Sequence, residues 1–323
     1  MSRAATVALV RWFHDPACTD VHQAGGKGAS LARLAAADLP VPPGFVVTSA
    51  AFAAFLAENG IDARIRALLQ RVDPTERRAL EDVAADIQEL ILTQPLPLEL
   101  DAAVAGAYAE LGHGEAIPVA VRSSAVAEDS QQASFAGQQE TFLDVRGVDD
   151  VLARIRACWA SFFSPRALFY RVRKGSLDDL AVAVVVQQLV VPEKAGVLFT
   201  VDPVQRRPDV LVVEAVWGFG EALVSGEVTP DHYEIERGSG RLLRCFVPPK
   251  TQMLGRGATG GLIALAVPEE QQRLPVLSEA ERAALVDLAV RVEAFFGVPQ
   301  DVEWAIAGGE LFVLQSRPIT TLA

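Results

Sequence analysis

DVEWAIAGGELFVLQSR, residues 301–317, contains two apolar stretches that meet at a pair of glycines. Glycines between apolar stretches predict two strands joined by a turn. Polar side chains interrupt both strands at a spacing of two, Asp301 with Glu303 and Gln315 with Arg317. Because side chains alternate along a strand, the members of each pair share one face. We therefore expect a closing hairpin that carries two pairs of polar groups.

These four side chains suit a metal–phosphate site. Carboxylate and amide oxygens are hard ligands for Mg2+, and arginine binds the phosphate oxygens that Mg2+ bridges. The alternative is an ion-paired sheet edge without a ligand. Register matters here, because a two-residue turn pairs Glu303 with Leu314 and sends Gln315 to the opposite face. A shared ion requires Glu303 opposite Gln315 and Asp301 opposite Arg317, which needs a three-residue loop or a bulge.

Away from this hairpin, the chain before residue 115 is mostly helical and the rest mixes strands with helices. Expected helices cover 29–37, 50–70, 74–92, 98–111, 148–160, 165–173 and 278–296, and expected strands cover 45–48, 117–122, 141–145, 181–191, 197–200, 210–214 and the closing pair. Residues 238–277, rich in glycine and proline, are expected to be irregular. Strands and helices do not alternate strictly, which predicts an α+β protein rather than a doubly wound sheet.

Composition limits the partners that this chain can have. Its 323 residues carry 29 Lys+Arg against 41 Asp+Glu, a formal net charge of −12, and half of them are hydrophobic. A chain this acidic is not expected to bind nucleic acid or an anionic membrane broadly, although a local phosphate site is compatible with it. Its three cysteines form no disulfide or metal pattern, and no apolar run is long enough to span a bilayer. These features predict a cytoplasmic protein in a reducing compartment.

A glycine-rich segment near the N-terminus is a second candidate site. Gly25-Gly-Lys-Gly28 precedes a predicted helix, and its glycines let the backbone pass close to another group. Lys27 at a helix start opposes the helix dipole unless an anion is also present. Lys27 therefore either meets an anion or is a solvated lysine on a flexible turn. The sequence lacks GxxxxGK[ST], HExxH and GxSxG, and Gly218-Phe-Gly220-Glu-Ala-Leu223 fails the third glycine of a GxGxxG fingerprint.

Two further side chains suit a nucleotide. Arg122 ends a predicted strand ahead of a small polar loop, and a guanidinium with the backbone N–H groups of such a loop suits phosphate oxygens. The alternative is a surface hairpin in which Arg122 pairs with Glu128 or Asp129. Gln187 lies inside an apolar strand, where a buried amide needs partners. Either a backbone group or the edge of an adenine would serve.

Further motifs follow one another in order between residues 24 and 319. They are GGKGASL (25–31), VPPGFVVT (41–48), VRSSA (121–125) with AED (127–129), ASFAGQQET (133–141), CW (158–159) with PRA (165–167), GVLFTVDP (196–203), WGFGEALVSG (217–226), DVEW (301–304) and QSRP (315–318). Together they resemble the nucleotide-binding domain of the phosphoenolpyruvate synthase and pyruvate phosphate dikinase family, which includes rifampicin phosphotransferase. One motif alone would be weak, whereas this ordered set is specific.

The resemblance implies an ATP-grasp fold, in which two lobes clamp ATP and adenine lies at the hinge. The first lobe is expected over residues 1–187, with a helical region over residues 1–115 and a phosphate-loop region over residues 116–187. The second lobe, residues 188–323, is expected to carry the metal-binding strands. The ATP-binding residues implied are Lys27, Arg122, Gly137, Thr141, Gln187, Glu303, Gln315 and Arg317. Of these, Lys27, Arg122 and Arg317 are the catalytic residues implied, and Glu303 and Gln315, with Asp301 nearby, are the Mg2+ ligands implied.

The activity implied is phosphoryl transfer from Mg-ATP to a histidine of a swivelling domain, for onward transfer to a small acceptor such as pyruvate or an antibiotic. The chain departs from the family at Val126, where threonine is frequent, and at Phe219, where leucine is frequent. None of its four histidines lies in a matching motif, so the acceptor histidine is expected on a further domain or a partner chain. Two alternatives stay open: an ATP-grasp kinase or ligase that acts directly on a small molecule and releases ADP, and an ATP-binding module without catalysis.

Overall fold

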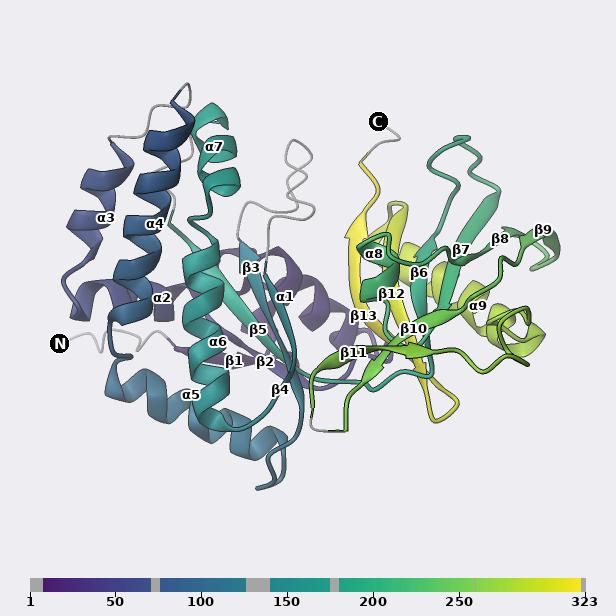
Figure 1. The fold of residues 1–323 in the computed structure, drawn as a ribbon, viewed down its shortest axis with the longest axis horizontal. Coiled ribbons are helices and arrows are strands. Elements are labelled where there is room, and N and C mark those ends of the chain that lie inside the picture. Colours follow the sequence, from purple (N-terminus) through teal and green to yellow (C-terminus); the bar gives the residue numbers. More distant parts are fainter. Residues whose placement is uncertain (1–7, 71–75, 126–139, 175–179, 259, 321–323) are drawn as a thin grey trace. The chain divides into compact units, whose positions relative to one another are not determined.

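The computed structural model describes residues 8–70, 76–125, 140–174, 180–258 and 260–320. The chain divides into two compact units, which we call unit 1 (Met1–Ala32 and Pro43–Leu189) and unit 2 (Arg33–Pro42 and Val190–Ala323). Each unit has its own sheet and its own hydrophobic core (Figure 1). Over the described ranges, helices accompany antiparallel sheets and no βαβ unit occurs, which confirms the α+β class expected from the sequence. No helix in the described portion of the chain is both long and apolar enough to cross a membrane.

Unit 1 is built on a five-stranded antiparallel sheet in the order β1-β2-β5-β3-β4. Its strands are β1 Val10–Trp12, β2 Gly44–Val47, β3 Val119–Ala125, β4 Thr141–Val145 and β5 Val182–Gln188. Its helices are α1 Val21–Ala36, which continues into unit 2, α2 Ser49–Glu58, α3 Asp62–Leu69, α4 Arg77–Thr93, α5 Leu98–Leu111, α6 Val148–Ser161 and α7 Pro165–Lys174, with the 3-10 turn η1 Pro16–Thr19. The central strand β5 is buried, as its β-branched residues predict.

The two faces of the unit 1 sheet are covered differently. One face packs against α2 and α6, where Trp159 lies 5.2 Å from Phe52 and 5.1 Å from Phe55 between ring centroids. Helix α1 covers the other face, because a Cβ added at Gly28 would lie 2.9 Å from a methyl of Val46 and 3.6 Å from a methyl of Val185. Only a glycine allows α1 to approach the sheet this closely.

The helix expected over residues 50–70 is wrong, because two helices occupy this range. Helix α2 ends at Glu58 and α3 begins at Asp62. Gly60 between them has φ +64, a conformation that ends helices and that glycine adopts without strain. Both helices bury apolar residues, so the helical spacing of apolar residues continues in the sequence on both sides of the break and hides it.

Unit 2 is built on a six-stranded antiparallel sheet in the order β13-β12-β6-β7-β8-β9. Its strands are β6 Lys194–Phe199, β7 Val210–Trp217, β8 Asp231–Glu236, β9 Leu242–Phe246, β12 Gln300–Ala307 and β13 Glu310–Pro318, and a separate pair is formed by β10 Gln252–Arg256 and β11 Leu262–Ala266. Helix α8 spans Glu221–Val224 and α9 spans Glu279–Phe296. One face of the sheet packs against α9 through Leu198, Val302 and Trp304, which are fully buried. The other face carries the polar groups described below.

The expectation that residues 238–277 are irregular is wrong, since β9, β10 and β11 lie within this range. Each of these strands has only five residues, and glycines and prolines separate them. Strands this short are hard to recognise by periodicity. The strand expected over 210–214 also extends further, to Trp217, so that Glu214 lies within β7 and not at its end.

An early segment of the chain completes the core of unit 2. Leu34 and Leu39 are buried with the residues that pack under α9. The carbonyl oxygen of Pro40 accepts a hydrogen bond from the backbone N–H of Val313 in β13, at 2.8 Å. The end of α1 and the residues after it therefore belong structurally to unit 2.

Candidate functional site

The hairpin of β12 and β13 has a two-residue turn and a bulge. Gly308 and Gly309 form the turn with φ of +59 and +79, so that Ala307 pairs with Glu310. Positive φ at both positions is the requirement of a type I′ turn. Glu303 pairs with Gln315, but the next residue of β12, Trp304, pairs with Val313. Leu314 is therefore an extra residue in β13, which makes the bulge. The bulge that a shared site requires after a two-residue turn is therefore confirmed.

The bulge brings the four polar groups of the hairpin to one face. Glu303 lies opposite Gln315, and Asp301 lies opposite Arg317. Directly opposed residues in an antiparallel pair share a face, as do residues two apart on one strand. Val302 and Trp304, which alternate with Asp301 and Glu303 along β12, are buried on the other face, against α9. Sequence spacing predicted the residues of this cluster, and the bulge brings them together.

An ion pair holds Asp301 and Arg317 together. The Arg317 Nε and Nη2 atoms lie 2.9 and 2.8 Å from Asp301 Oδ2. Burial raises the pKa of the Asp301 carboxyl, and the charge of Glu303 adds to the increase, while Arg317 opposes it. Half of the cluster thus forms the ion pair that the ligand-free alternative expects. The Asp301 carboxylate orients the Arg317 guanidinium, and the same carboxylate could equally bind a metal.

Glu303 and Gln315 fit a metal only to a limited extent. They offer one carboxylate and one amide, both with hard oxygen donors. Within the described ranges no group of three or more His, Cys, Asp or Glu side chains is placed to hold a metal ion. Mg2+ usually keeps several waters and binds through one or two protein ligands together with substrate phosphates. The donor set fits an ion that arrives with a phosphate ligand rather than a resident metal.

A second polar group continues along the same face of the unit 2 sheet. The register runs from Glu303 through Val197 in β6 to Glu214 in β7 and His232 in β8. His232 Nδ1 lies 3.5 Å from Glu214 Oε1. This pair was not predicted, because Glu214 and His232 lie on different strands, eighteen residues apart in the sequence.

An arginine closes the far side of this polar face. Arg207 Nη2 lies 2.7 Å from both Asp202 Oδ2 and Glu234 Oε2. Burial raises the pKa of Asp202. Hydrogen bonds from the backbone N–H groups of Gln205 and Val204 and from Arg207 lower the pKa by more, so that the net effect is a decrease. These acids are compensated and hold the loop 202–207 against the sheet.

In unit 1, three of the expected residues share one face of the sheet. Arg122 in β3 lies opposite both Thr141 in β4 and Val185 in β5. Gln187 is two residues from Val185 and therefore points to the same side. This is the face that α1 covers. Gly137 of the same expected set lies outside the described residues.

Lys27 lies on α1, just beyond a break in that helix. Gly25 has φ +68 and ψ 175, so α1 consists of two helical segments joined at a kink. The Lys27 Nζ donates a hydrogen bond to the backbone oxygen of Ser123, at 3.2 Å. The side chain therefore extends to the strand that carries Arg122, and the alternative of a solvated lysine on a flexible turn is not what the structure shows.

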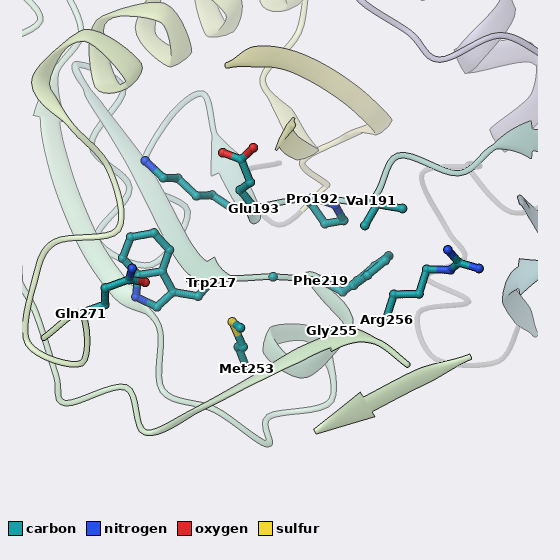
Figure 2. A pocket seen from close by; sticks show the side chains of 11 residues that line it. Val191, Pro192, Glu193, Trp217, Phe219, Met253, Gly255, Arg256 and Gln271 are labelled. Carbon is teal, nitrogen blue, oxygen red and sulfur yellow. The ribbon is translucent and has the colours of Figure 1, made fainter. Parts of the chain in front are cut away.

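A pocket of about 350 Å³ lies within unit 2. Figure 2 shows Trp217, Phe219 and Met253 around it, with Arg256 at one end and the backbone of 191–194 along one side. The indole Nε1 of Trp217 is buried and has no hydrogen-bond partner among the described residues. Two aromatic walls and a thioether suit a flat ring. Sequence reasoning did not predict this pocket.

Comparisons with known proteins place the chain in a family. Residues 21–323 match the family described as "Pyruvate phosphate dikinase, AMP/ATP-binding domain". A probable phosphoenolpyruvate synthase of Methanothermobacter thermautotrophicus is 44% identical over 321 residues, which are 98% of this chain and 46% of that protein. A rifampicin phosphotransferase of a Streptomyces species is 42% identical over 317 residues, 97% of this chain and 36% of that protein. A phosphoenolpyruvate synthase of Pyrococcus furiosus is 36% identical, covering 97% of this chain and 44% of that protein.

The chain belongs to the AMP/ATP-binding domain family of the pyruvate phosphate dikinases. The resemblance predicted from the motifs is thereby confirmed, and the ATP-grasp fold follows from the family membership. The chain spans less than half the length of each of these three relatives.

Among solved structures, a D-alanyl-alanine synthetase A of Vibrio cholerae matches 90% of this chain and 58% of its own, at 12% identity and a TM-score of 0.31. A D-alanine–D-alanine ligase of Bacillus anthracis matches 74% of this chain and 55% of its own, at 7% identity and a TM-score of 0.28. Scores this low do not support a detailed structural comparison.

Proposed function

We propose that this chain binds Mg-ATP and starts a dikinase reaction, in which a phosphoryl group passes to a histidine that these 323 residues do not supply. The observation that carries the proposal is the β13 bulge, which sets Glu303 opposite Gln315 and Asp301 opposite Arg317 on one face. A bulge at this point aligns two oxygen donors and a guanidinium that a regular hairpin would separate. Family membership supports ATP as the ligand.

The residues divide into two sets with distinct tasks. In unit 1, Lys27 and Arg122 supply positive charge for phosphate oxygens, Gly137 and Thr141 approach the phosphates, and Gln187 meets the adenine edge. In unit 2, Glu303 and Gln315 hold Mg2+, and Arg317 contacts the phosphates from a direction fixed by Asp301. The list of proposed ligands is Lys27, Arg122, Gly137, Thr141, Gln187, Glu303, Gln315 and Arg317, with Asp301 as the neighbour of the metal.

Little covalent chemistry falls to these side chains. Phosphoryl transfer is accelerated chiefly by positioning and by neutralising charge on the transferred group. Bound Mg2+ would supply further neutralisation of the phosphate oxygens. Lys27, Arg122 and Arg317 bind and orient the phosphate chain, and Asp301 keeps Arg317 from rotating away.

The nucleophile comes from elsewhere in this proposal. In-line transfer needs a nucleophile on the far side of the phosphorus, and none of the four histidines lies in a motif that would supply it. A histidine on a swivelling domain or a partner chain would receive the phosphoryl group and pass it to a small molecule. We further propose a cytoplasmic protein that needs neither nucleic acid nor a membrane, which its acidic charge and three free cysteines support.

Nucleotide analysis tests the proposal. The chain alone should bind Mg-ATP and hydrolyse it slowly, since water is a poor substitute for the histidine. Addition of a histidine-bearing domain from a relative should yield AMP, phosphate and an acid-labile phosphohistidine. Fast ADP formation with a small acceptor and no AMP would instead identify a kinase or ligase that acts directly. Tight binding without any turnover in the presence of that domain would identify a non-catalytic module.

A further inference from the structure

A buried hydroxyl of unit 1 links the glycine-rich segment to the strand that carries Arg122. Ser124 in β3 is fully buried. Its Oγ–H donates to the carbonyl oxygen of Ala24 at 2.8 Å, and its Oγ accepts from the N–H of Gly28 at 3.1 Å. Ala24 and Gly28 are four residues apart, which is the spacing of one helical hydrogen bond. The hydroxyl therefore joins two groups that an unbroken helix would join to each other.

The backbone of α1 is shaped to admit this hydroxyl. Gly25 has φ +68 and ψ 175, which interrupts the helix between Ala24 and Gly28. A Cβ at Gly25 would lie 2.1 Å from the Ser124 backbone oxygen and 2.3 Å from its Oγ. The kink and the serine thus occupy the same space, and only glycine fits between them.

Lys27 follows the kink and depends on it for its direction. Residues on a helix turn by about 100° each, so opening or closing the helix before Lys27 changes where its side chain points. Ser124 and Arg122 lie two apart on β3 and share a face. The Lys27 Nζ meets β3 at the backbone oxygen of Ser123. Strand β3 therefore binds α1 at the kink through Ser124 and also binds the Lys27 side chain beyond the kink.

We propose that Ser124 is a positioning residue for Lys27, keeping α1 open at Gly25 so that Lys27 lies beside Arg122. The inference rests on the proposed function, in which Lys27 and Arg122 bind the phosphates of ATP. Loss of the hydroxyl leaves Ala24 O and Gly28 N–H able to bond to each other, so the helix can close. Closure of the helix changes the direction of the Lys27 side chain, while the bond from the Gly28 N–H to the Ala24 oxygen replaces part of the lost hydrogen bonding. Ser124→Ala should therefore weaken phosphate binding more than it weakens the fold.

The matched control is Ser161→Ala, which also removes a buried hydroxyl from unit 1. Ser161 Oγ donates to the carbonyl oxygen of Cys158 at 2.8 Å, in a helix that carries none of the proposed ligands. Calorimetric titration of each variant with Mg-ATP and, separately, with adenosine measures phosphate and base binding apart. For Ser124→Ala we expect the Kd for Mg-ATP to rise about tenfold and that for adenosine to change by less than about twofold. Ser161→Ala should change neither.

A second readout does not require ATP binding. Acetylation of Lys27 by a soluble acylating reagent, followed by peptide mass spectrometry with Lys194 as internal standard, reports the environment of its Nζ. Ser124→Ala should change the relative rate by about threefold or more, and Ser124→Thr, which keeps the hydroxyl, should restore it.

Each outcome decides the inference. Equal Mg-ATP affinity and Lys27 labelling in Ser124→Ala and Ser161→Ala would overturn it, as would equal losses of ATP and adenosine or a Ser124→Thr variant that behaves like Ser124→Ala. Failure of the wild-type chain to bind Mg-ATP would reject the proposed function instead. In that case the labelling of Lys27 still tests the role of Ser124.

Discussion

Substitution of Gly25 by alanine tests how closely α1 and β3 must approach. Gly25 has φ +68 and ψ 175, a region that essentially only glycine occupies, and placing another residue there costs about 1–3 kcal/mol. The new Cβ would lie 2.1 Å from the Ser124 backbone oxygen, so the helix and the strand must separate. Overpacking of this kind adds about 1–3 kcal/mol. We expect Gly25→Ala to lower the free energy of unfolding by about 2–6 kcal/mol, the sum of the two contributions.

Gly60→Ala is the matched control for this substitution. Gly60 also belongs to unit 1 and has φ +64, but no atom lies within 4 Å of the position of its Cβ. Its replacement should cost only the backbone term, about 1 kcal/mol. Urea unfolding followed by circular dichroism measures both variants against the wild type. The difference between them combines the close approach of Gly25 to Ser124 with the larger backbone cost at Gly25.

The result that would refute this reasoning is a Gly25→Ala variant no less stable than Gly60→Ala. Such a result would mean that α1 and β3 can separate freely and that the kink is not held by contact. Titration with Mg-ATP gives a second check, since Gly25→Ala should weaken ATP binding and Gly60→Ala should not.

Three further changes have expected outcomes. Mg-ATP at a hundredfold excess over its Kd should stabilise the wild type by about 2.7 kcal/mol, and Glu303→Ala or Arg317→Ala should remove most of the resulting Tm increase. Deletion of Leu314 gives a regular hairpin in which Gln315 still lies opposite Glu303, so ATP affinity should persist. Deletion of Ser316 instead moves Arg317 to the opposite face from Gln315, so ATP affinity should be abolished. For Glu281, burial raises the pKa, but hydrogen bonds from a lysine and a helix N-terminus lower it below its usual 4.5. Its charge therefore stabilises the fold above about pH 4.5, and the advantage of the wild type over Glu281→Gln should vanish as the pH falls below that value.

Controls and contrary results for these changes are direct. Arg241→Ala removes an exposed arginine that pairs with Glu236, far along the sheet from the hairpin turn, and should keep the full Tm increase. An unchanged increase in both site variants would refute the site assignment. Loss of ATP binding on deletion of Leu314 would show that the bulge itself contributes a contact. A stability difference for Glu281→Gln that is constant with pH would show that its ion pair with Lys194 contributes no pKa shift.

The polar face of the closing hairpin could be predicted from the sequence because it depends on local spacing. The two-residue periodicity identified Asp301 with Glu303 and Gln315 with Arg317, and counting residues around the turn required either a three-residue loop or a bulge, of which the structure has the bulge. The position of the bulge, at Leu314, could not be predicted, since any residue between the turn and Gln315 would satisfy the count.

Long-range partners account for much of what the sequence did not predict. Strand β8 was not expected, and its first residue, Asp231, is fully buried. It is compensated by Lys250, whose Nζ lies 2.5 Å from Asp231 Oδ1, and by Tyr233, whose hydroxyl donates to Asp231 Oδ2 at 2.8 Å. A partner nineteen residues away leaves no periodic signal, so a buried acid of this kind resembles a loop residue in the sequence. Ser124 was overlooked for the same reason, because its two partners lie about a hundred residues earlier.

The assignment of residues 33–42 to unit 2 has a consequence for synthesis on the ribosome. Leu34, Leu39 and the carbonyl of Pro40 emerge early, yet the Val313 N–H that binds this carbonyl is made roughly 270 residues later. At about 5–20 residues per second, this apolar segment waits on the order of tens of seconds for the rest of its core. Unit 1 can complete its own core meanwhile, while the nascent chain keeps Leu34 and Leu39 without their native neighbours. The segment is therefore the place where we expect a chaperone to be needed before translation ends.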